Sequence, residues 1–261
     1  MSGLFKNISG SVALVTGACS GLGRGVAERL VSQGAKVAVL DLPQANGKEV
    51  VESLGPNAIF VPADVSDETS VKTALNTVKE KYGKLDSIVN CAGVAFAFKL
   101  YSLKKKEVHP IDNIKRTFDV NILGTFNVIR HGIPLIMENE MDDQKQRGVI
   151  INTASIAAYD GQIGQSAYSA SKGAIVGATL PLARDLKNDG IRVMAIAPGL
   201  FETPMLASLP PKVREFLIDT VPNPTRFGSP EEFAALVQHI MENRYLNGEV
   251  IRLDAALRMM P

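Results

Sequence analysis

Three residues in the second half of the sequence carry side chains that could together move a proton. Tyr168 and Lys172 are four residues apart, a spacing that places both side chains on one face of a helix. There the Lys172 ammonium could hold the pKa of the Tyr168 phenol below its usual value of about 10 and make it a usable base. With Ser155 at the substrate oxygen, the set would remove a hydroxyl proton while hydride leaves the carbon for a nicotinamide.

Asn121 extends this set, because it could anchor a water molecule that relays the proton. Each residue alone also has an ordinary structural interpretation: Ser155 could cap a helix, Tyr168 could lie in the core, Lys172 could be solvated and Asn121 could be structural. The four residues together are far less expected by chance than any one of these residues alone. We therefore predict that Tyr168, Lys172, Ser155 and Asn121 are catalytic.

A glycine-rich segment, residues 16–23 (TGACSGLG), follows the first predicted strand and precedes a predicted helix. Gly17, Gly21 and Gly23 would let the backbone come close to a diphosphate, and the helix N-terminus would aim N–H groups and the positive end of its dipole at it. Glycine triplets also occur in plain turns, but the position directly after the first strand favours phosphate binding.

Asp41 ends the second predicted strand, about 20 residues past the glycine segment, where a carboxylate can accept hydrogen bonds from both hydroxyls of an adenosine ribose. Such a carboxylate would repel a 2′-phosphate, and Ser20 stands where a basic residue would favour the phosphorylated cofactor. The sequence therefore favours NAD over NADP. Asp64, at the end of the third strand before Val65, is placed to contact the adenine amino group, although both aspartates could instead be caps.

These residues need a scaffold, and the rest of the chain predicts one. Short β-branched runs alternate with segments whose apolar residues recur at three- and four-residue spacing. The predicted strands are 11–16, 36–41, 58–62, 85–90, 148–154, 191–197 and 249–254, and the predicted helices are 21–33, 68–82, 111–138, 168–188 and 230–243. Several strands are continuously apolar, as expected when helices cover both faces of a parallel sheet. We predict an α/β fold, a Rossmann-type doubly wound parallel seven-stranded sheet.

The alternation predicts a single domain over residues 1–261, because no linker, repeat or low-complexity tract interrupts it. We expect Pro134 and Pro181 to end or kink their helices. Surface insertions are expected near 94–110 and 139–148, and a substrate lid near 200–228, where five prolines lie among apolar residues. The run Lys104–Lys106 could bind the phosphates of coenzyme A, or could be an ordinary solvated face.

The composition agrees with an enzyme of this kind and excludes other classes. The chain is 46% hydrophobic and 21% charged with a net charge of +1, which argues against disorder and gives no basic excess for nucleic acid. Its 2 cysteines fit a reducing compartment, and no apolar stretch is long enough to predict a membrane span. The 3 histidines lack ligand-spaced partners, so no metal site is expected.

From residue 11 to residue 254 the sequence resembles the short-chain dehydrogenase/reductase family. The resemblance is carried by the glycine segment, Asp64, Asn121, Ser155, Tyr168 and Lys172, by Asn90-Cys91-Ala92-Gly93, and by Pro198-Gly199. Two positions depart from the family pattern. Cys91 stands where a second asparagine is usual, and Asp254-Ala255-Ala256 replaces the frequent Asp-Gly-Gly, for which we expect only local packing differences.

Within the family, the sequence most strongly resembles members that act on short or branched 3-hydroxyacyl-CoA thioesters and, less selectively, on hydroxysteroids. It implies an NAD-dependent mitochondrial homotetramer, with the cytoplasm as the alternative location. The implied cofactor contacts are Gly17, Ser20, Gly21, Leu22, Gly23, Asp41, Asp64, Val65, Cys91, Ala92, Gly93, Tyr168, Lys172, Pro198, Phe201 and Thr203, and the implied substrate contacts are Ser155, Tyr168 and Leu206.

Two alternatives remain open at this point. The enzyme could prefer a steroid or another secondary alcohol, using the same four catalytic residues. In a different class of function, the fold could serve as a scaffold subunit of a mitochondrial tRNA-processing assembly, with partner proteins rather than substrates. The intact set of Ser155, Asn121, Tyr168 and Lys172 favours an enzyme, because a pure scaffold does not need all four.

Overall fold

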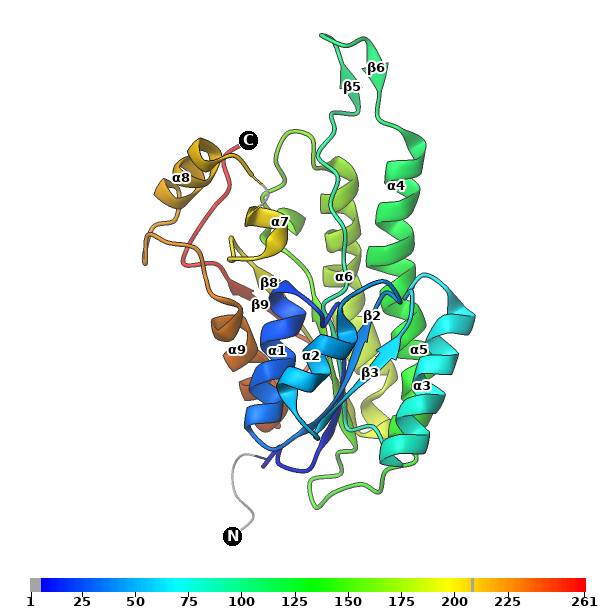
Figure 1. The fold of residues 1–261 in the computed structure, drawn as a ribbon. Helices are drawn as coiled ribbons and strands as arrows, with labels where there is room; N and C mark the ends of the chain where they lie inside the picture. Colours follow the sequence, from blue (N-terminus) through cyan, green and yellow to red (C-terminus); the bar gives the residue numbers. More distant parts are fainter. Residues whose placement is uncertain (1–5, 208) are drawn as a thin grey trace.

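A computed structural model describes residues 6–207 and 209–261. Its centre is a parallel sheet of seven strands in the order β3-β2-β1-β4-β7-β8-β9 (Figure 1). The strands are β1 (Val12–Thr16), β2 (Lys36–Asp41), β3 (Ala58–Pro62), β4 (Ser87–Asn90), β7 (Gly148–Thr153), β8 (Ile191–Pro198) and β9 (Val250–Leu253). All seven predicted strands are confirmed, with ends shifted by two residues at most.

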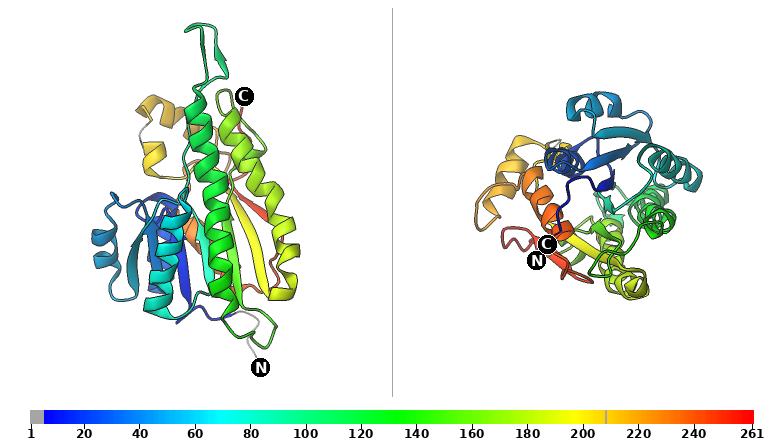
Figure 2. Two further views of the ribbon diagram at one scale, coloured as in Figure 1. Left: turned by 90° about the vertical axis from the view of Figure 1, so that its right-hand side faces the viewer. Right: turned by 90° about the horizontal axis from the view of Figure 1, so that it is seen from below.

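Both faces of the sheet are buried, which explains its continuously apolar strands. In β1, Ala13 and Val15 belong to one core cluster, whereas Val12 and Leu14 belong to another on the opposite face. The first cluster is closed by α1 (Gly21–Ser32) and α9 (Pro230–Glu242), and the second by α3 (Glu68–Tyr82), α5 (Thr125–Met137) and the end of α6 (Ser166–Asp185). The two views of Figure 2 show these layers from the side and from below. The predicted Rossmann-type architecture is confirmed.

The predicted helix 111–138 is three segments in the structure. α4 (Ile111–Phe118) passes into a π-helical stretch, Asp119–Gly124, and then into α5. Such wide turns often occur at functional sites, and this one contains Asn121. The helix α2 (Gly47–Leu54) has no counterpart among the predicted helices.

Pro134 and Pro181, which were expected to end or kink their helices, do not end them. α5 continues beyond Pro134 to Met137, and α6 continues beyond Pro181 to Asp185. Both prolines are exposed, so water can bond the carbonyl groups that lose their helical N–H partners. Burial of the opposite face of each helix then keeps that helix continuous across its proline.

Four short elements lie outside the sheet, in the predicted insertion near 94–110 and in the predicted lid near 200–228. The strands β5 (Tyr101–Ser102) and β6 (Glu107–Val108) form a hairpin that projects from the body of the molecule (Figure 1). The helices α7 (Pro204–Ala207) and α8 (Pro211–Asp219) lie in the predicted lid. The described helices include none that is long and apolar enough to cross a membrane.

The turn after β9 differs from what the sequence led us to expect. Ala255 and Ala256 have φ angles of 51° and 65°, so two consecutive alanines adopt the left-handed region that glycine occupies readily. The expectation of local packing differences alone is therefore wrong here, because the backbone itself is strained.

The start of α9 gives a direct test of a local interaction. Ser229 and Glu232 form a capping box, in which each side chain accepts a hydrogen bond from the other residue's backbone N–H. Replacing Ser229 by Ala should lower the free energy of unfolding by about 1 kcal/mol, measured by urea denaturation. Replacing the exposed Ser32 by Ala should change it by less than about 0.5 kcal/mol; equal effects of the two changes would contradict this account.

Candidate active site

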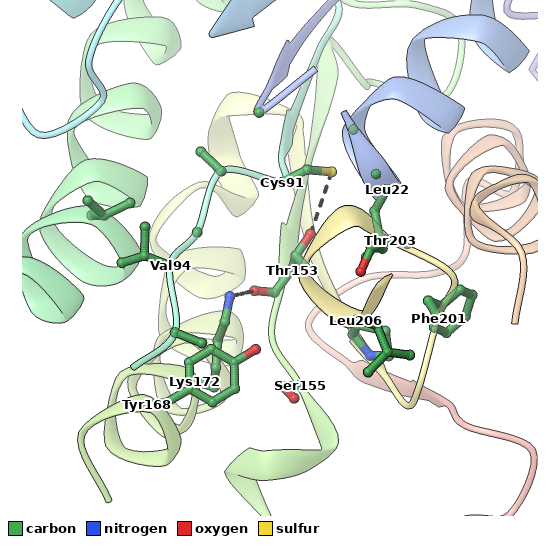
Figure 3. Close-up of a pocket in the computed structure, with 18 of the residues that line it drawn as sticks. Leu22, Cys91, Val94, Thr153, Ser155, Tyr168, Lys172, Phe201, Thr203 and Leu206 are labelled. Atoms are coloured by element: carbon green, nitrogen blue, oxygen red, sulfur yellow. Dashed lines mark hydrogen bonds between the residues drawn. The ribbon is translucent and has the colours of Figure 1, made fainter. Parts of the chain in front are cut away.

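One pocket of about 500 Å³ lies where the carboxyl ends of the parallel strands meet the segment that contains α7. The pocket is lined by every residue predicted to contact cofactor or substrate, from the glycine segment to Leu206. Of the predicted site residues, Asn121 alone does not line it. Figure 3 shows Tyr168 and Lys172 on one side, with Phe201, Thr203 and Leu206 facing them across the pocket. The fold thus brings together residues that are far apart in the sequence.

The glycine segment packs too closely for side chains. A Cβ on Gly23 would lie 2.3 Å from the Gly17 carbonyl oxygen, and one on Gly17 would lie 2.9 Å from Ala92. The Thr16 hydroxyl accepts hydrogen bonds from the N–H groups of Cys91 and Ala92, both at 3.1 Å, and so joins the ends of β1 and β4. α1 begins within the segment, at Gly21, with its N-terminus at the same pocket.

Two aspartates stand at strand ends on this side of the pocket. Asp41 accepts hydrogen bonds from the N–H of Cys19 at 2.9 Å and of Leu42 at 2.8 Å, which fixes its carboxylate at the pocket wall. Asp64 accepts from Ser66 and pairs with Arg116 at 3.2 Å. Although burial opposes ionisation, these two partners together lower the pKa of Asp64. Both carboxylates are therefore held as oriented hydrogen-bond acceptors.

The thiols of this region are held in their protonated form. Burial raises the pKa of Cys91 to about 11, and burial together with the neighbouring Asp41 raises that of Cys19 to about 12. The Thr153 hydroxyl donates to the Cys91 sulfur at 3.7 Å. Cys91 lines the pocket as a small neutral side chain, where an asparagine is usual in the family pattern.

Tyr168, Lys172 and Ser155 meet at the middle of the pocket (Figure 3). Lys172 is 5% exposed, and its ammonium donates to the Thr153 carbonyl oxygen at 2.7 Å and lies 5.9 Å from the centre of the Tyr168 ring. Ser155 follows β7, and its hydroxyl accepts a hydrogen bond from the N–H of Ala157 at 3.1 Å. The i, i+4 spacing on α6 places the phenol and the ammonium on one face, as predicted.

The expected lowering of the Tyr168 pKa is wrong for this arrangement. Burial raises the pKa of Tyr168, and the interaction with the Ser155 hydroxyl opposes that rise without reversing it. Burial also lowers the pKa of Lys172 to about 8. The Lys172 ammonium points to the Thr153 carbonyl. Desolvation is the largest cause of the pKa shift of both Tyr168 and Lys172.

Asn121 lies behind the pocket wall. Its side chain is 1% exposed; the carbonyl oxygen accepts from the N–H of Val94, and the amide donates to the Val94 carbonyl, both at 2.9 Å. The amide also donates to the Ser171 hydroxyl at 3.0 Å, which ties the π-helical stretch to α6. These bonds fix the backbone at Val94 and the helix that carries Tyr168. The catalytic role of Asn121 stays a prediction.

Several residues of the pocket were not found from the sequence. Thr153 supplies the carbonyl that binds Lys172, and Arg116 pairs with Asp64. Residues 94–97 line the pocket, so the start of the predicted surface insertion is part of the site. Gln162 and Met259 also line it, and neither belongs to a recognisable motif. Their positions depend on long-range packing, for which the local sequence carries no signal.

A family model described as short chain dehydrogenase matches residues 11–214. The chain belongs to the short chain dehydrogenase family, whose members use NAD or NADP. A human protein named 3-hydroxyacyl-CoA dehydrogenase type-2 is 57% identical over 261 residues, the full length of both chains. The protein of the same name from Drosophila melanogaster is 57% identical over 254 residues, 97% of this chain and all of the relative.

A solved structure extends the comparison to three dimensions. The crystal structure of 3-hydroxyacyl-CoA dehydrogenase type-2 from Mycobacterium avium superposes with a TM-score of 0.92 at 36% sequence identity. The match covers 98% of this chain and 99% of the other. The fold, including the sheet order, is therefore that of a short chain dehydrogenase.

The pocket residues fit a nicotinamide dinucleotide. The missing Cβ atoms of Gly17 and Gly23 leave room for backbone approach, and the N-terminus of α1 presents N–H groups to a diphosphate. Asp41 stands at the end of β2, where an adenosine ribose is bound in this fold. Tyr168 and Ser155 stand across the pocket from these groups, where a nicotinamide and a substrate could meet.

Lys172 gives a test by pH. Its folded pKa of about 8 lies below its ordinary value of 10.5, so between these values the unfolded chain binds more protons and the wild type becomes more stable as pH rises. Lys172→Met should therefore be more stable than wild type at pH 7, by on the order of 2 kcal/mol after the loss of the bond to Thr153.

The measurement is urea denaturation of wild type and variant from pH 7 to pH 10.5. The difference in free energy of unfolding should shrink across this range. The exposed Lys115→Met variant serves as the matched control, and its difference from wild type should stay constant. A constant difference for Lys172→Met would contradict the buried-ammonium account.

Proposed function

We propose that the chain interconverts short or branched 3-hydroxyacyl-CoA and 3-ketoacyl-CoA with NAD as hydride carrier. The observation that carries this proposal is the single pocket in which the glycine segment and Asp41 are continuous with Ser155, Tyr168 and an apolar compartment. The apolar compartment includes Leu206, Leu209, Leu217 and Met259. The substrate class is supported by the names of relatives that are 57% identical over nearly the whole chain.

The chain's own residues carry the proton chemistry. When bound, the nicotinamide supplies a two-electron acceptor for the hydride that leaves the alcohol carbon. The Ser155 hydroxyl orients the substrate oxygen. Once the Tyr168 phenol has lost its own proton to solvent, the phenolate oxygen takes the hydroxyl proton as the carbonyl forms. In the reverse direction Tyr168 returns the proton to the ketone oxygen. Burial raises its pKa, so at neutral pH the phenol is protonated and ready for that reduction.

Lys172 and Asn121 support this proton transfer in different ways: Lys172 through its charge, and Asn121 through the segments that it fixes. The Lys172 ammonium lies near the Tyr168 ring and would stabilise negative charge on the phenol oxygen during oxidation. Its hydrogen bond to the Thr153 carbonyl fixes the ammonium at the end of β7. Asn121 fixes Val94 and α6, and through them the wall opposite the glycine segment.

Three lysines of the β5–β6 hairpin are candidates for binding the phosphates of coenzyme A. Lys104, Lys105 and Lys106 lie exposed at the turn of the β5–β6 hairpin, beyond the residues that line the pocket. Residues 98–100 connect the pocket-lining residues 94–97 to the hairpin, so an extended thioester could leave the pocket along it. α7 and α8 supply the apolar lid residues Leu206 and Leu217, which supports ordering of the lid on substrate binding.

The resemblance of the sequence to its family supports a homotetramer in the mitochondrial matrix. The role of a scaffold in mitochondrial tRNA processing, with partner proteins, would be an additional function of the same fold. A hydroxysteroid is the competing substrate, since it would use the same catalytic residues and the same apolar compartment; initial rates on acetoacetyl-CoA and on a hydroxysteroid separate the two.

Tyr168→Phe tests the proposed reaction. The variant keeps the ring but loses the hydroxyl that carries the proton, so kcat for acetoacetyl-CoA reduction should fall by about 10³-fold or more. NADH affinity, measured by fluorescence titration, should change less than threefold. Tyr82→Phe, a change far from the pocket, serves as the control and should leave kcat unchanged. Full turnover by Tyr168→Phe would contradict the assignment of Tyr168 as the base.

Asp41→Asn tests the choice of NAD over NADP. Asparagine keeps an oxygen to accept from the Cys19 N–H but removes the negative charge that would repel a 2′-phosphate. The ratio of kcat/KM for NADH to that for NADPH should fall at least tenfold, measured at fixed ionic strength. Asp67→Asn, at the cap of α3, is the matched control and should leave the ratio unchanged. An unchanged ratio in Asp41→Asn would contradict the assignment.

A further inference from the structure

The C-terminal residues 257–261 run back to the pocket after β9. The strained turn at Ala255 and Ala256 redirects the chain, and Met259 then reaches the pocket wall. Non-glycine residues in this conformation persist only where the surroundings impose it, and they cluster at functional sites. The segment is called the C-terminal tail below.

Charged groups fix the base of the tail. Arg252 on β9 binds the Asp160 carboxylate at 2.6 Å, the Asp254 carboxylate at 2.7 Å and the Leu257 carbonyl at 3.0 Å. Arg258 also bonds Asp254, at 3.1 Å. Asp160 lies in the loop between Ser155 and α6, so this network connects the tail to the loop that leads to Tyr168.

Apolar packing strengthens the same connection. Leu257 is 1% exposed and belongs to a core cluster with Ile156 and Val221. Ile156 directly follows Ser155, and Leu200 and Met259 pack against the cluster. The tail is thus seated on the backbone next to the serine that is proposed to orient the substrate.

A glutamine holds the end of the tail at the pocket. The Gln162 amide donates to the Met260 carbonyl oxygen at 2.9 Å, and Gln162 itself lines the pocket. The neighbouring Gln165 amide donates to the Gln162 side-chain oxygen at 3.3 Å. Of the two adjacent methionines, Met259 lines the pocket, whereas Met260 is 68% exposed.

We propose that the C-terminal tail is a wall of the acyl compartment, with Met259 as the residue that limits acyl-chain length and Gln162 as the residue that positions it. This inference rests on the proposed function, because it assumes an acyl chain in the apolar part of the pocket. A flexible thioether suits such a wall, since it adapts to short or branched chains and still occupies the space that a longer chain needs. The tail belongs to the same chain as the pocket that Met259 lines.

The two methionines allow a matched experiment. With NAD present, calorimetry would give the dissociation constants of butyryl-CoA and decanoyl-CoA for wild type, Met259→Ala and Met260→Ala. We expect Met259→Ala to shift the ratio of the two constants at least fivefold in favour of decanoyl-CoA, and Met260→Ala to shift it less than twofold. Equal shifts in both variants, or no shift in Met259→Ala, would overturn the inference.

Gln162→Leu tests the positioning role. It keeps the size of the side chain but removes the donor to the Met260 carbonyl, so the ratio should move in the same direction as in Met259→Ala. Hydrogen–deuterium exchange of the C-terminal peptide should accelerate in Gln162→Leu and stay unchanged in Met259→Ala. A shifted ratio with unchanged exchange would mean that Gln162 contacts the ligand directly, and would overturn its positioning role.

Turnover of acetoacetyl-CoA by the wild type is measured separately. A failure of the proposed function would appear there, as absent turnover. A failure of the tail inference would appear in the binding ratio, which needs no turnover, so the two outcomes can be distinguished.

Discussion

The close approach between the glycine segment and its surroundings is the constraint on which the site depends. Gly23 has no room for a Cβ because the Gly17 carbonyl is already there, and Gly17 has none because of Ala92. These contacts set the distance between the start of α1 and the ends of β1 and β4, and with it the floor of the pocket. The Thr16 hydroxyl then holds the end of β4 in place.

Much of the site could be predicted from the sequence because parallel strands deliver their carboxyl ends to one edge. The apolar runs identified all seven strands, and the strand order places the residues that follow them side by side. Asp41, Ser155 and the glycine segment are therefore found from strand ends alone. The spacing of Tyr168 and Lys172 adds the helix that faces them. Local pattern and global topology agree at these positions.

Other features depend on contacts that no local pattern encodes. The π-helical turn at Asn121 is stabilised by hydrogen bonds to Val94 and Ser171, from two different parts of the chain. The Tyr168 pKa is raised by burial, a property of the assembled core rather than of the spacing to Lys172. Pro134 and Pro181 were expected to end or kink their helices, but both helices continue past them, because the prolines face solvent. Met259 reaches the pocket only through a strained turn at two alanines.

The protonated state of the two thiols has a consequence for the chemical durability of the site. Oxidants and electrophiles attack the thiolate, and a thiol with a pKa of about 11 or 12 exposes on the order of one thiolate in 10⁴ to 10⁵ molecules at neutral pH. Cys91 and Cys19 are thereby slow to oxidise although one lines the pocket and the other lies beside Asp41. The small thiolate fraction therefore slows the reaction of both cysteines with oxidants on the dinucleotide side of the pocket.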